Sequence, residues 1–402
     1  MATMRTSFSR EAVVLGCSLN GLGVVRSLGS AGIRTTVVGT RYTGAALWSR
    51  HASSRLIRSY TGDDFVEDMV ALGKTFSQPP ALFLTLEETV HSVSENREEL
   101  SKWFRFTLPD RSCVEDLSDK STFHRFCLIH GFPVPRSVVL ETPQDVEMLA
   151  DFTFPCVLKP DDKRAALSGK IDRAVRADTL ADVRERVSST LDAGTRIVAQ
   201  EWINGPDSNI YFTLFYRSSD GRVAAAFTGR KLSSEPVNVG STAICVAAPE
   251  ARSVLEPITL DFAERANLVG MASMEYKWDE SKKQFFMVEP TIGRTDWQEE
   301  IATLCGTNIP AAAFFHDLGI PLIQGGVALE NVAWRATISE VLPSHLRSSV
   351  SRFVDGYFRW DDPLPALQHY LLVNPLRRLM ITSGKRARLP QQKKSFGGKA
   401  IG

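Results

Sequence analysis

The chain has 402 residues, of which 43% are apolar and 23% are charged, which is the composition of an ordinary globular protein. This composition excludes a collagen-like or wholly disordered chain, and the length predicts two or three domains. Lysine and arginine total 47 against 46 aspartate and glutamate residues, so the formal net charge of +1 argues against nucleic acid as the main partner. The sequence contains no uninterrupted apolar run of about 18 residues, so we expect no membrane span.

The N-terminal segment and the cysteines favour a cytoplasmic protein. Residues 1–16 contain two arginines but no apolar segment before a cleavage site, so we expect no secretory signal. The two nearest cysteines, Cys113 and Cys127, are 14 residues apart, which excludes a C-x-x-C pair and zinc-ligand spacing. Scattered cysteines of this kind predict reduced thiols in the core. The six are Cys17, Cys113, Cys127, Cys156, Cys245 and Cys305.

The first domain, predicted over residues 1–115, has the pattern of an open α/β sheet. Residues 11–39 predict a strand, a glycine-bearing turn, a helix that stops at Gly32, and a second buried strand, and residues 81–85 predict another strand. A strand–helix–strand order is typical of a parallel, Rossmann-like sheet. The turn at 16–23 could hold a phosphate at the helix N-terminus, but it lacks the G-x-G-x-x-G spacing and no acidic residue follows the second strand. We therefore prefer a turn without a nucleotide.

A different pattern follows over residues 116–335, where strands in hairpins alternate with helices and predict an α+β domain. We expect a helix that stops at Gly131, strands at 154–160 and 195–203, and a hairpin within 271–290. Residues 336–382 are predicted to form a helical appendage, with homodimerisation left open. Residues 383–402 are predicted to be a disordered tail, and contact with anionic lipid or nucleic acid is the alternative to a plain solvated tail. The basic residues of this end of the chain are Arg377, Arg378, Lys385, Arg386, Arg388, Lys393, Lys394 and Lys399.

Charged residues with the chemistry of a phosphate and metal site stand at strand ends and hairpins of the second domain. Lys159 ends a strand and precedes a proline, which suits a cation held at a fixed position against a phosphate. Asp207, just after a polar turn, could accept hydrogen bonds from ribose hydroxyls. Glu275 and Glu289 lie on two strands joined by a short turn, so both carboxylates could reach one face and bind Mg²⁺. A plain solvated position remains the alternative for each of these residues taken alone.

In order, these features resemble the ATP-grasp superfamily, over roughly residues 11–300. The motifs are Lys120 in a DK helix start, Lys159 in VLKP, the segment QEWINGPD, Lys231 in GRKLSSEPVNVGS, Glu275 in MEYK, and VEPTIGR at 288–294. The resemblance is to the carboxylate–amine ligase group, which is D-aspartate-ligase-like or carbamoyl-phosphate-synthase-like. It implies an ATP-grasp fold of two lobes that follows the N-terminal domain and holds ATP between the lobes.

The resemblance also implies a reaction and a role for each residue. ATP would phosphorylate a small-molecule carboxylate, an amino-acid-like amine would attack the acyl phosphate, and ADP and phosphate would leave. By position, the ATP phosphates would contact Lys120, Lys159 and a loop with Ser168 and Gly169 at its tip. The adenine would contact Gln200, Glu201, Trp202 and Ile203, and the ribose would contact Asp207. Mg²⁺, or alternatively Mn²⁺, would bind Glu275, Glu289 and Thr291, while Lys231 and Arg294 would act on the transferring phosphoryl group.

The last metal motif departs from the family pattern of Glu-x-Asn followed by arginine. Here the motif is Glu289-Pro290-Thr291, with Arg294 one position later than expected. Because a threonine hydroxyl is a weaker Mg²⁺ ligand than an amide carbonyl, the second metal site is the weakest part of the prediction. Two alternatives to a ligase stay open: a nucleotide-binding regulatory or scaffold protein with a degenerate site, and a dinucleotide-dependent oxidoreductase. The sequence does not identify the carboxylate or the amine.

Overall fold

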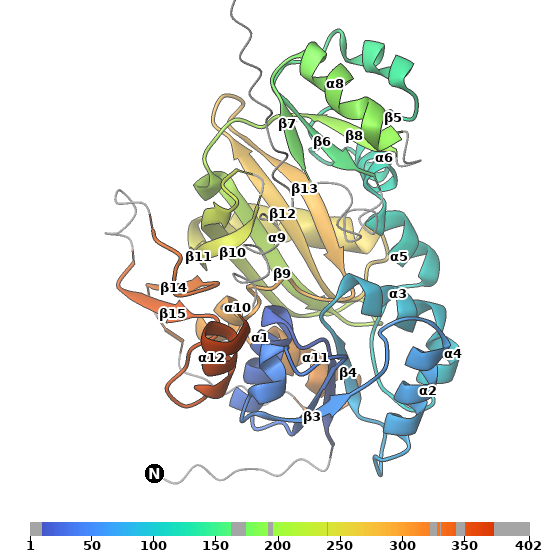
Figure 1. The fold of residues 1–402 in the computed structure, drawn as a ribbon, viewed down its shortest axis with the longest axis vertical. Helices are drawn as coiled ribbons and strands as arrows, with labels where there is room; N and C mark the ends of the chain where they lie inside the picture. The colour runs from blue at the N-terminus through green and yellow to red at the C-terminus, as the bar shows by residue number, and fades with distance from the viewer. Residues whose placement is uncertain are drawn as a thin grey trace, which may run out of the picture.

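The computed structural model describes residues 10–161, 174–191, 196–238, 240–321, 328–329, 331–342 and 350–373. These residues form three sheets, one of four parallel strands, one of four antiparallel strands and one of seven strands (Figure 1). The mixture of a parallel sheet with antiparallel sheets confirms the predicted order of an α/β unit followed by an α+β unit.

The parallel sheet has the order β3-β2-β1-β4. Strand β1 carries four consecutive buried residues, AVVL, as expected of a strand covered on both faces. It pairs in parallel with β2 and with β4, which confirms the predicted parallel sheet, while β3 was not predicted because its sequence ASSRL is polar and partly exposed. The strands are β1 (Ala12–Leu15), β2 (Thr35–Gly39), β3 (Ala52–Leu56) and β4 (Ala81–Leu84). The helical segments of this part are α1 (Leu19–Ser30), η1 (Ala45–Trp48), α2 (Gly62–Gly73), α3 (Glu87–Glu95) and α4 (Arg97–Leu100).

The small antiparallel sheet has the order β5-β8-β6-β7. Helix α6 leads into it: Asp119 caps the helix by accepting the N–H of Thr122 at 2.8 Å, and Gly131 ends the helix with a φ of 74°. The strands are β5 (Ser137–Leu140), β6 (Cys156–Pro160), β7 (Val175–Ala177) and β8 (Ile197–Glu201), and the helical segments are α5 (Arg111–Ser118), α6 (Lys120–His130), η2 (Pro143–Leu149) and α8 (Leu180–Leu191). Strands β6 and β8 lie inside the two segments predicted as strands.

The large sheet has the order β13-β12-β9-β10-β11-β14-β15, and its neighbours are antiparallel except for the last pair. Its central strands are two hairpins, which confirms the hairpin predicted within 271–290. The strands are β9 (Ile210–Arg217), β10 (Val223–Glu235), β11 (Ser241–Ala247), β12 (Gly270–Asp279), β13 (Gln284–Ile292), β14 (Val332–Arg335) and β15 (Arg352–Asp355). The helical segments are η3 (Asp207–Asn209), α9 (Pro249–Arg265), α10 (Glu300–Leu304), α11 (Ile309–Asp317), α12 (Leu364–Leu367) and the turn η5 (Gln368–Val373).

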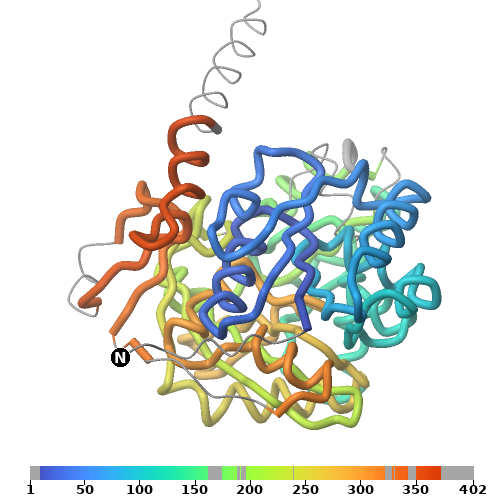
Figure 2. The backbone as a smooth tube through the Cα atoms, turned by 90° about the horizontal axis from the view of Figure 1, so that it is seen from below, coloured from blue at the N-terminus to red at the C-terminus, as the bar shows by residue number. Residues whose placement is uncertain are grey.

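The prediction of a helical appendage over 336–382 is corrected by strand β15, which extends the large sheet. Its four residues, RFVD, pair in parallel with β14, and only a partner distant in sequence makes so short a segment a strand. Figure 2 shows the C-terminal segment, in red, beside the first elements of the chain, in blue. Residues 374–402, which include the predicted tail, lie outside the described residues.

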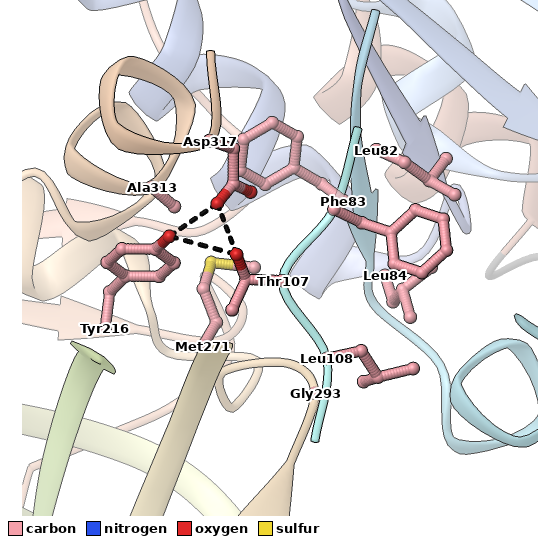
Figure 3. A pocket seen from close by; sticks show the side chains of 11 residues that line it. Leu82, Phe83, Leu84, Thr107, Leu108, Tyr216, Met271, Gly293, Ala313 and Asp317 are labelled. Atoms are coloured by element: carbon pink, nitrogen blue, oxygen red, sulfur yellow. Dashed lines mark hydrogen bonds between the residues drawn. The ribbon is translucent and has the colours of Figure 1, made fainter. Parts of the chain in front are cut away.

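A small cavity lies where β4, β9 and α11 meet (Figure 3). Its volume of about 10 Å³ is about that of a single water probe. Asp317 accepts hydrogen bonds there from the hydroxyls of Tyr216 and Thr107, and burial raises the pKa of this carboxyl. These bonds join three elements distant in sequence, and none of the predicted site residues lines the cavity.

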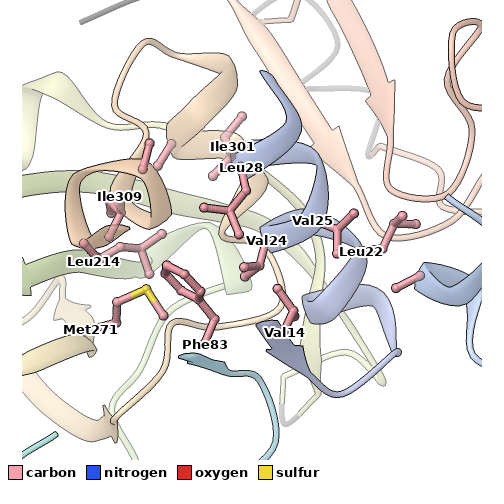
Figure 4. Packing of buried hydrophobic residues seen from close by; sticks show 14 of the residues in the cluster. Val14, Leu22, Val24, Val25, Leu28, Phe83, Leu214, Met271, Ile301 and Ile309 are labelled. Carbon is pink, nitrogen blue, oxygen red and sulfur yellow. The ribbon is translucent and has the colours of Figure 1, made fainter. Parts of the chain in front are cut away.

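One hydrophobic cluster joins the parallel sheet to the large sheet. Helix α1 contributes Val24 and Leu28, which face the same cluster as Phe83 of β4, Leu214 of β9 and Ile309 of α11 (Figure 4). All five side chains are fully or almost fully buried. Burial stabilises a fold by about 25 cal/mol for each Å² of apolar surface removed from water. This shared cluster therefore holds the parallel sheet against the large sheet.

The six cysteines are free, as predicted, and Cys127, Cys156 and Cys245 are buried. Among the described residues, no helix has the length and apolar character needed to cross a membrane.

A buried ion pair joins α1 to the C-terminal segment. The Nε of Arg26 donates to Asp362 at 3.0 Å, and its Nη1 donates to the carbonyl of Gly356 at 2.7 Å. The Asp362 carboxylate also accepts from the Ser49 hydroxyl at 2.8 Å and from the N–H of Arg50 at 2.9 Å. Both charged groups are buried, and the only other carboxylate paired with Arg26 among the described residues is that of Glu300, at 3.9 Å. Loss of either member of the pair therefore leaves the other poorly compensated.

Asp362→Ala should therefore lower the free energy of unfolding by about 3 kcal/mol, since it leaves the buried Arg26 guanidinium with Glu300, at 3.9 Å, as its paired carboxylate. The matched control is Asp361→Ala, whose side chain is 68% exposed and lies 3.8 Å from His51. The control should change stability by less than about 1 kcal/mol. Urea unfolding of both variants measures the difference, and equal midpoints would contradict the structural role of this pair.

Glu299 is a second buried carboxyl between α1 and α10, and it has hydroxyl partners rather than a cation. It accepts from the hydroxyl of Ser27 at 3.1 Å and from that of Thr303 at 3.2 Å. Burial raises the pKa of Glu299 from its ordinary value of 4.5 to about 8, against the opposing effect of the Ser27 bond. The raised pKa means that the folded state favours the protonated form, so stability is full below pH 4.5 and falls as the pH rises toward 8.

Glu299→Gln should remove this pH dependence, since the amide is neutral and nearly isosteric. Between pH 5 and 8 the wild-type protein should lose up to about 1.4 kcal/mol of stability per pH unit through this group, and the variant should not. Urea unfolding at pH 5, 6.5 and 8 makes the measurement, with the exposed Glu98→Gln as a control that keeps the wild-type slope. Parallel wild-type and Glu299→Gln curves would show that Glu299 is ionised throughout.

Candidate active site

The predicted site residues come from two sheets. The small sheet supplies residues on β6 and β8, and the large sheet supplies residues on β10, β12 and β13. Figure 1 shows the small sheet standing at one end of the long strands β12 and β13. Ser168 and Gly169 lie outside the described residues.

Lys159 and Lys120 both lie at the end of β6. The Nζ of Lys159 donates to the Oε1 of Gln200 on the neighbouring strand β8 at 3.0 Å. The Nζ of Lys120 donates to the carbonyl of Pro160 at 3.0 Å. Asp161 holds the start of α6 in this place by accepting the N–H of Ser121 at 2.9 Å. The fold therefore brings together two lysines that are 39 positions apart in the sequence.

The segment 200–203 leaves β8 with its first N–H groups already bonded. The N–H of Glu201 donates to the carbonyl of Arg136 at 2.9 Å, and that of Trp202 donates to the carbonyl of Pro155 at 3.1 Å. These two N–H groups therefore serve the small sheet and are not available to a base. The side chain of Glu201 also turns to the small sheet, where it accepts the N–H of Thr153 at 3.2 Å.

Two cations lie near the ring of Trp202. The guanidinium of Arg176 is 5.2 Å from the centre of its ring, and the ammonium of Lys277 is 4.9 Å from it. Both distances are within the range of a cation–π interaction. Ile203, the next residue, is buried.

Asp207 is 6% exposed and holds a loop of the large sheet. Its two carboxylate oxygens accept the N–H groups of Ser234 at 2.9 Å and Asn238 at 3.0 Å. A carboxylate has about four acceptor positions, so these two bonds leave lone pairs for further donors. The carboxylate thus fixes the loop after β10 whether or not it also meets a ligand.

Glu275 and Glu289 are directly opposite each other on β12 and β13. Opposed residues of an antiparallel pair share one face with their Cβ atoms about 4.5–5.5 Å apart, so the two side chains lie on one face as the sequence analysis predicted. Glu275 also forms an ion pair of 2.5 Å with Lys231 of β10. The register between β12 and β13 shifts directly after Glu275, where β13 has one extra residue, Val288, as in a β-bulge.

Lys231 is the centre of charge of this face. Burial alone lowers the pKa of its ammonium, but Glu275 first, and then Asp296 and Glu289, raise the pKa by more. Its pKa therefore lies above the ordinary value, and three carboxylates are within electrostatic range of one buried cation.

Asp296 was not predicted as a site residue, although it lies beside Thr291. It accepts hydrogen bonds from the hydroxyls of Thr291 at 2.8 Å and Ser273 at 2.7 Å. The sequence signal for Asp296 was its position, since it is an acidic residue just after a motif that was expected to supply a metal-binding carboxylate. Arg294 of the same loop forms an ion pair of 3.0 Å with Glu87 of α3, a partner from the first domain that no local pattern predicts.

Lys277 is the second residue that the sequence analysis missed. It is two positions after Glu275 on β12, so it points to the same face, and its side chain is buried. Burial lowers the pKa of the Lys277 ammonium. The charges of Lys159 and Lys231 lower this pKa further, whereas Asp207 and Glu275 raise it. Lysines of both sheets therefore act on one buried ammonium, and the period of two along β12 could have identified it.

The oxygen donors of this face fit a hard divalent cation in kind, since Mg²⁺ prefers carboxylate oxygens. Within the part of the chain that the structure describes, no three histidine, cysteine, aspartate or glutamate side chains converge as a metal site. The carboxylates of Glu275, Glu289 and Asp296 instead act on Lys231. The carboxylates of this face therefore stabilise positive charge. A metal ion needs this property of its site, whether it binds alone or together with a phosphate.

No family model matches the chain. The chain is 24% identical over 315 residues to the D-aspartate ligase of Enterococcus faecium (strain Aus0004), and the match covers 74% of each protein. Its fold is similar to that of N5-carboxyaminoimidazole synthetase from Staphylococcus aureus, with a TM-score of 0.60, 12% identity and 81% of each chain covered.

It is also similar in fold to biotin carboxylase from Campylobacter jejuni, with a TM-score of 0.59, 15% identity, and 78% of this chain and 72% of the other covered. A further neighbour, the biotin carboxylase domain of a Hydrogenobacter thermophilus 2-oxoglutarate carboxylase, was solved with ADP, its magnesium salt and bicarbonate. That structure has a TM-score of 0.60 and 14% identity, with 78% of this chain and 70% of the other covered. The chain is thus similar in sequence to a D-aspartate ligase and similar in fold to an N5-carboxyaminoimidazole synthetase and to biotin carboxylases.

Proposed function

We propose that the protein is an ATP-dependent carboxylate–amine ligase that forms an amide-type bond through an acyl phosphate and releases ADP and phosphate. One observation carries the proposal: the ammonium of Lys277 on the large sheet is 4.9 Å from the ring centre of Trp202, directly after the small sheet. The charges of Lys159 on the small sheet and Glu275 on the large sheet both shift the pKa of this ammonium. Charges of both signs from two lobes converge on one place, as a bound triphosphate and its metal require.

The small sheet is proposed to bind the nucleotide. Because the N–H groups of Glu201 and Trp202 are bonded within the sheet, we assign the adenine edge to the carbonyl groups of segment 200–203 and to the N–H of Ile203. Asp207 accepts from the ribose with its remaining lone pairs while it fixes the loop after β10. Lys159 and Lys120 pair with phosphate oxygens at the end of β6, where point charges stabilise the negative phosphates.

The large sheet is proposed to hold the metal and the reacting groups. Glu275 and Glu289, opposite each other on β12 and β13, would hold Mg²⁺ together with the phosphates, and the metal when bound neutralises phosphate charge. The Thr291 hydroxyl of β13 donates to Asp296. Lys231 remains protonated because its pKa is raised, so it can accompany the transferring phosphoryl group as a cation. Arg294, oriented by Glu87, stabilises the same negative charge from the side of the first domain.

The chemistry is largely positional. The substrate carboxylate oxygen attacks the terminal phosphorus of ATP, the bond to ADP breaks, and an acyl phosphate forms. The amine then attacks the acyl carbon, phosphate leaves, and the amine loses a proton. Holding these groups in line supplies most of the acceleration in such reactions. The proposed substrates are small, amino-acid-like acids and amines, and the name of the Enterococcus relative makes D-aspartate the first to test.

A second candidate function is nucleotide binding without ligation, in a regulatory or scaffold role. The observation that favours it is the commitment of the Thr291 hydroxyl to Asp296 in place of an amide ligand to a second metal. The two functions differ in one property: only a ligase releases ADP in proportion to added acid and amine.

The first experiment is a calorimetric titration of the protein with ATP and with NADPH, each with and without Mg²⁺. We expect ATP to bind more tightly with Mg²⁺ present and NADPH not to bind, because the proposed phosphate site lies in the second domain. A screen of acids and amines for ADP release follows, beginning with D-aspartate. Binding of NADPH without binding of ATP would move the site to the first domain, and ATP binding without substrate-dependent ADP release would favour the second candidate.

Glu289→Gln should lower kcat by about a hundredfold or more while the fold stays intact, because it removes one negative charge opposite Glu275 without changing shape. The matched control is Glu280→Gln in the turn between β12 and β13, where the side chain is 60% exposed. Steady-state ADP release and a thermal melt are measured for both. Near wild-type turnover in Glu289→Gln would remove this residue from the site.

Lys159→Ala should likewise abolish turnover and weaken ATP binding by about tenfold or more, since it removes a cation from the end of β6. Its control is Lys283→Ala, a side chain that is 72% exposed in the turn after β12. Calorimetry with Mg²⁺ and ATP reads the binding separately from the reaction. Unchanged affinity and turnover in Lys159→Ala would contradict the assignment of this lysine to a phosphate.

A further inference from the structure

Lys277 of β12 is a buried cation that lacks an anion. It is 8% exposed, and its ammonium is 4.9 Å from the centre of the Trp202 ring. Among the described residues, no carboxylate lies within ion-pair distance of this ammonium. The two carboxylates whose charges reach it are both engaged elsewhere. Glu275 pairs with Lys231 at 2.5 Å, and Asp207 accepts two backbone N–H groups of the loop after β10.

An ammonium in this position is costly for the fold. Burial takes a full charge and three N–H donors out of water, and the face of one indole ring returns only part of that free energy. Lys231, another buried lysine of the same sheet, has a carboxylate partner in Glu275. At Lys277 the fold carries a positive charge that no described residue pairs with, as is expected of a residue that binds an anionic ligand.

The strand places this charge between the proposed metal carboxylates and the proposed adenine segment. Lys277 is two residues after Glu275 on β12, so their Cα atoms are about 7 Å apart and both side chains point to one face. Lys277 is also opposite Ile210 of β9, which directly follows η3 and its Asp207. The order along this face is therefore Glu275, then Lys277, then Asp207 and Trp202.

A nucleotide presents its groups in the same order, from the outer phosphates through the inner phosphate and the ribose to the base. With the outer phosphates and the metal at Glu275 and the ribose at Asp207, the group that remains for Lys277 is the phosphate attached to the ribose.

We propose that the ammonium of Lys277 binds the phosphate attached to the ribose of an adenine nucleotide. The inference rests on the proposed function, which places ATP between the two sheets. This phosphate is present in both ATP and ADP and is not transferred, so Lys277 stabilises substrate and product alike. It therefore acts on the affinity for the nucleotide and not on the chemical step.

The test is Lys277→Met, which removes the ammonium and keeps the length of the side chain. Calorimetry of the full chain without Mg²⁺ gives the affinity for ADP, and competition with ADP gives those for AMP and adenosine. We expect ADP and AMP to bind about tenfold or more weakly to the variant, and adenosine to bind as it does to the wild type, since adenosine lacks the phosphate. The KM for ATP should rise at unchanged kcat. The empty variant should melt at or above the wild-type temperature, because it has lost an unpaired buried charge.

The matched control is Lys74→Met in the first domain, because the Lys74 ammonium also lies near a tryptophan ring, 5.5 Å from the centre of that of Trp103. It removes the same charge and the same kind of contact, and it should bind all three compounds like the wild type.

Three results would overturn the inference. Wild-type affinity for ADP and AMP in Lys277→Met would do so and leave the proposed function standing, and a raised KM for the acid substrate alone would assign Lys277 to the substrate carboxylate. Weaker binding of adenosine with a lower melting temperature would show that Lys277 supports the fold around Trp202. No binding of ADP to the wild type, with or without Mg²⁺, would overturn the proposed function as well.

Discussion

The ion pair between Lys231 and Glu275 is the interaction on which the candidate site depends. Both groups lie on central strands of the large sheet, and the lysine is 5% exposed. A buried ammonium is costly unless an anion compensates it, and adjacent carboxylates repel one another unless a cation lies between them. Glu275, with Asp296 and Glu289, holds the pKa of the Lys231 ammonium above its ordinary value, so the face keeps a buried cation among its acidic residues. A triphosphate with a divalent cation presents the complementary arrangement of charge.

Backbone pairing explains why this part of the site was predictable. Glu275 and Glu289 flank a short turn, so the hairpin and the period of two along its strands place both side chains on one face. Lys159 was predictable for a similar reason, because a strand that ends at a proline has a definite end. The same rule applied once more, two residues beyond Glu275, would have found Lys277. The order of the sheets along the chain could also be predicted, because it follows from patterns of apolar residues that are local in the sequence.

Contacts between segments far apart in the chain could not be predicted in this way. Arg294 finds Glu87 across more than two hundred residues, and strand β15 exists because β14 offers it a free edge. The bonds that use up the N–H groups of Glu201 and Trp202 likewise depend on where the loops before β5 and β6 pass. A single sequence holds no signal for such pairings, since loop closure brings together residues whose local patterns are independent.

Helix α1 connects the candidate site to the C-terminal segment. Near its start, the Nδ2 of Asn20 donates to the carbonyl of Thr295 at 2.8 Å, beside Arg294. Two turns later, Arg26 holds Asp362 of the C-terminal segment. Because both contacts are buried, this one helix fixes the proposed phosphoryl-transfer loop relative to the C-terminal segment.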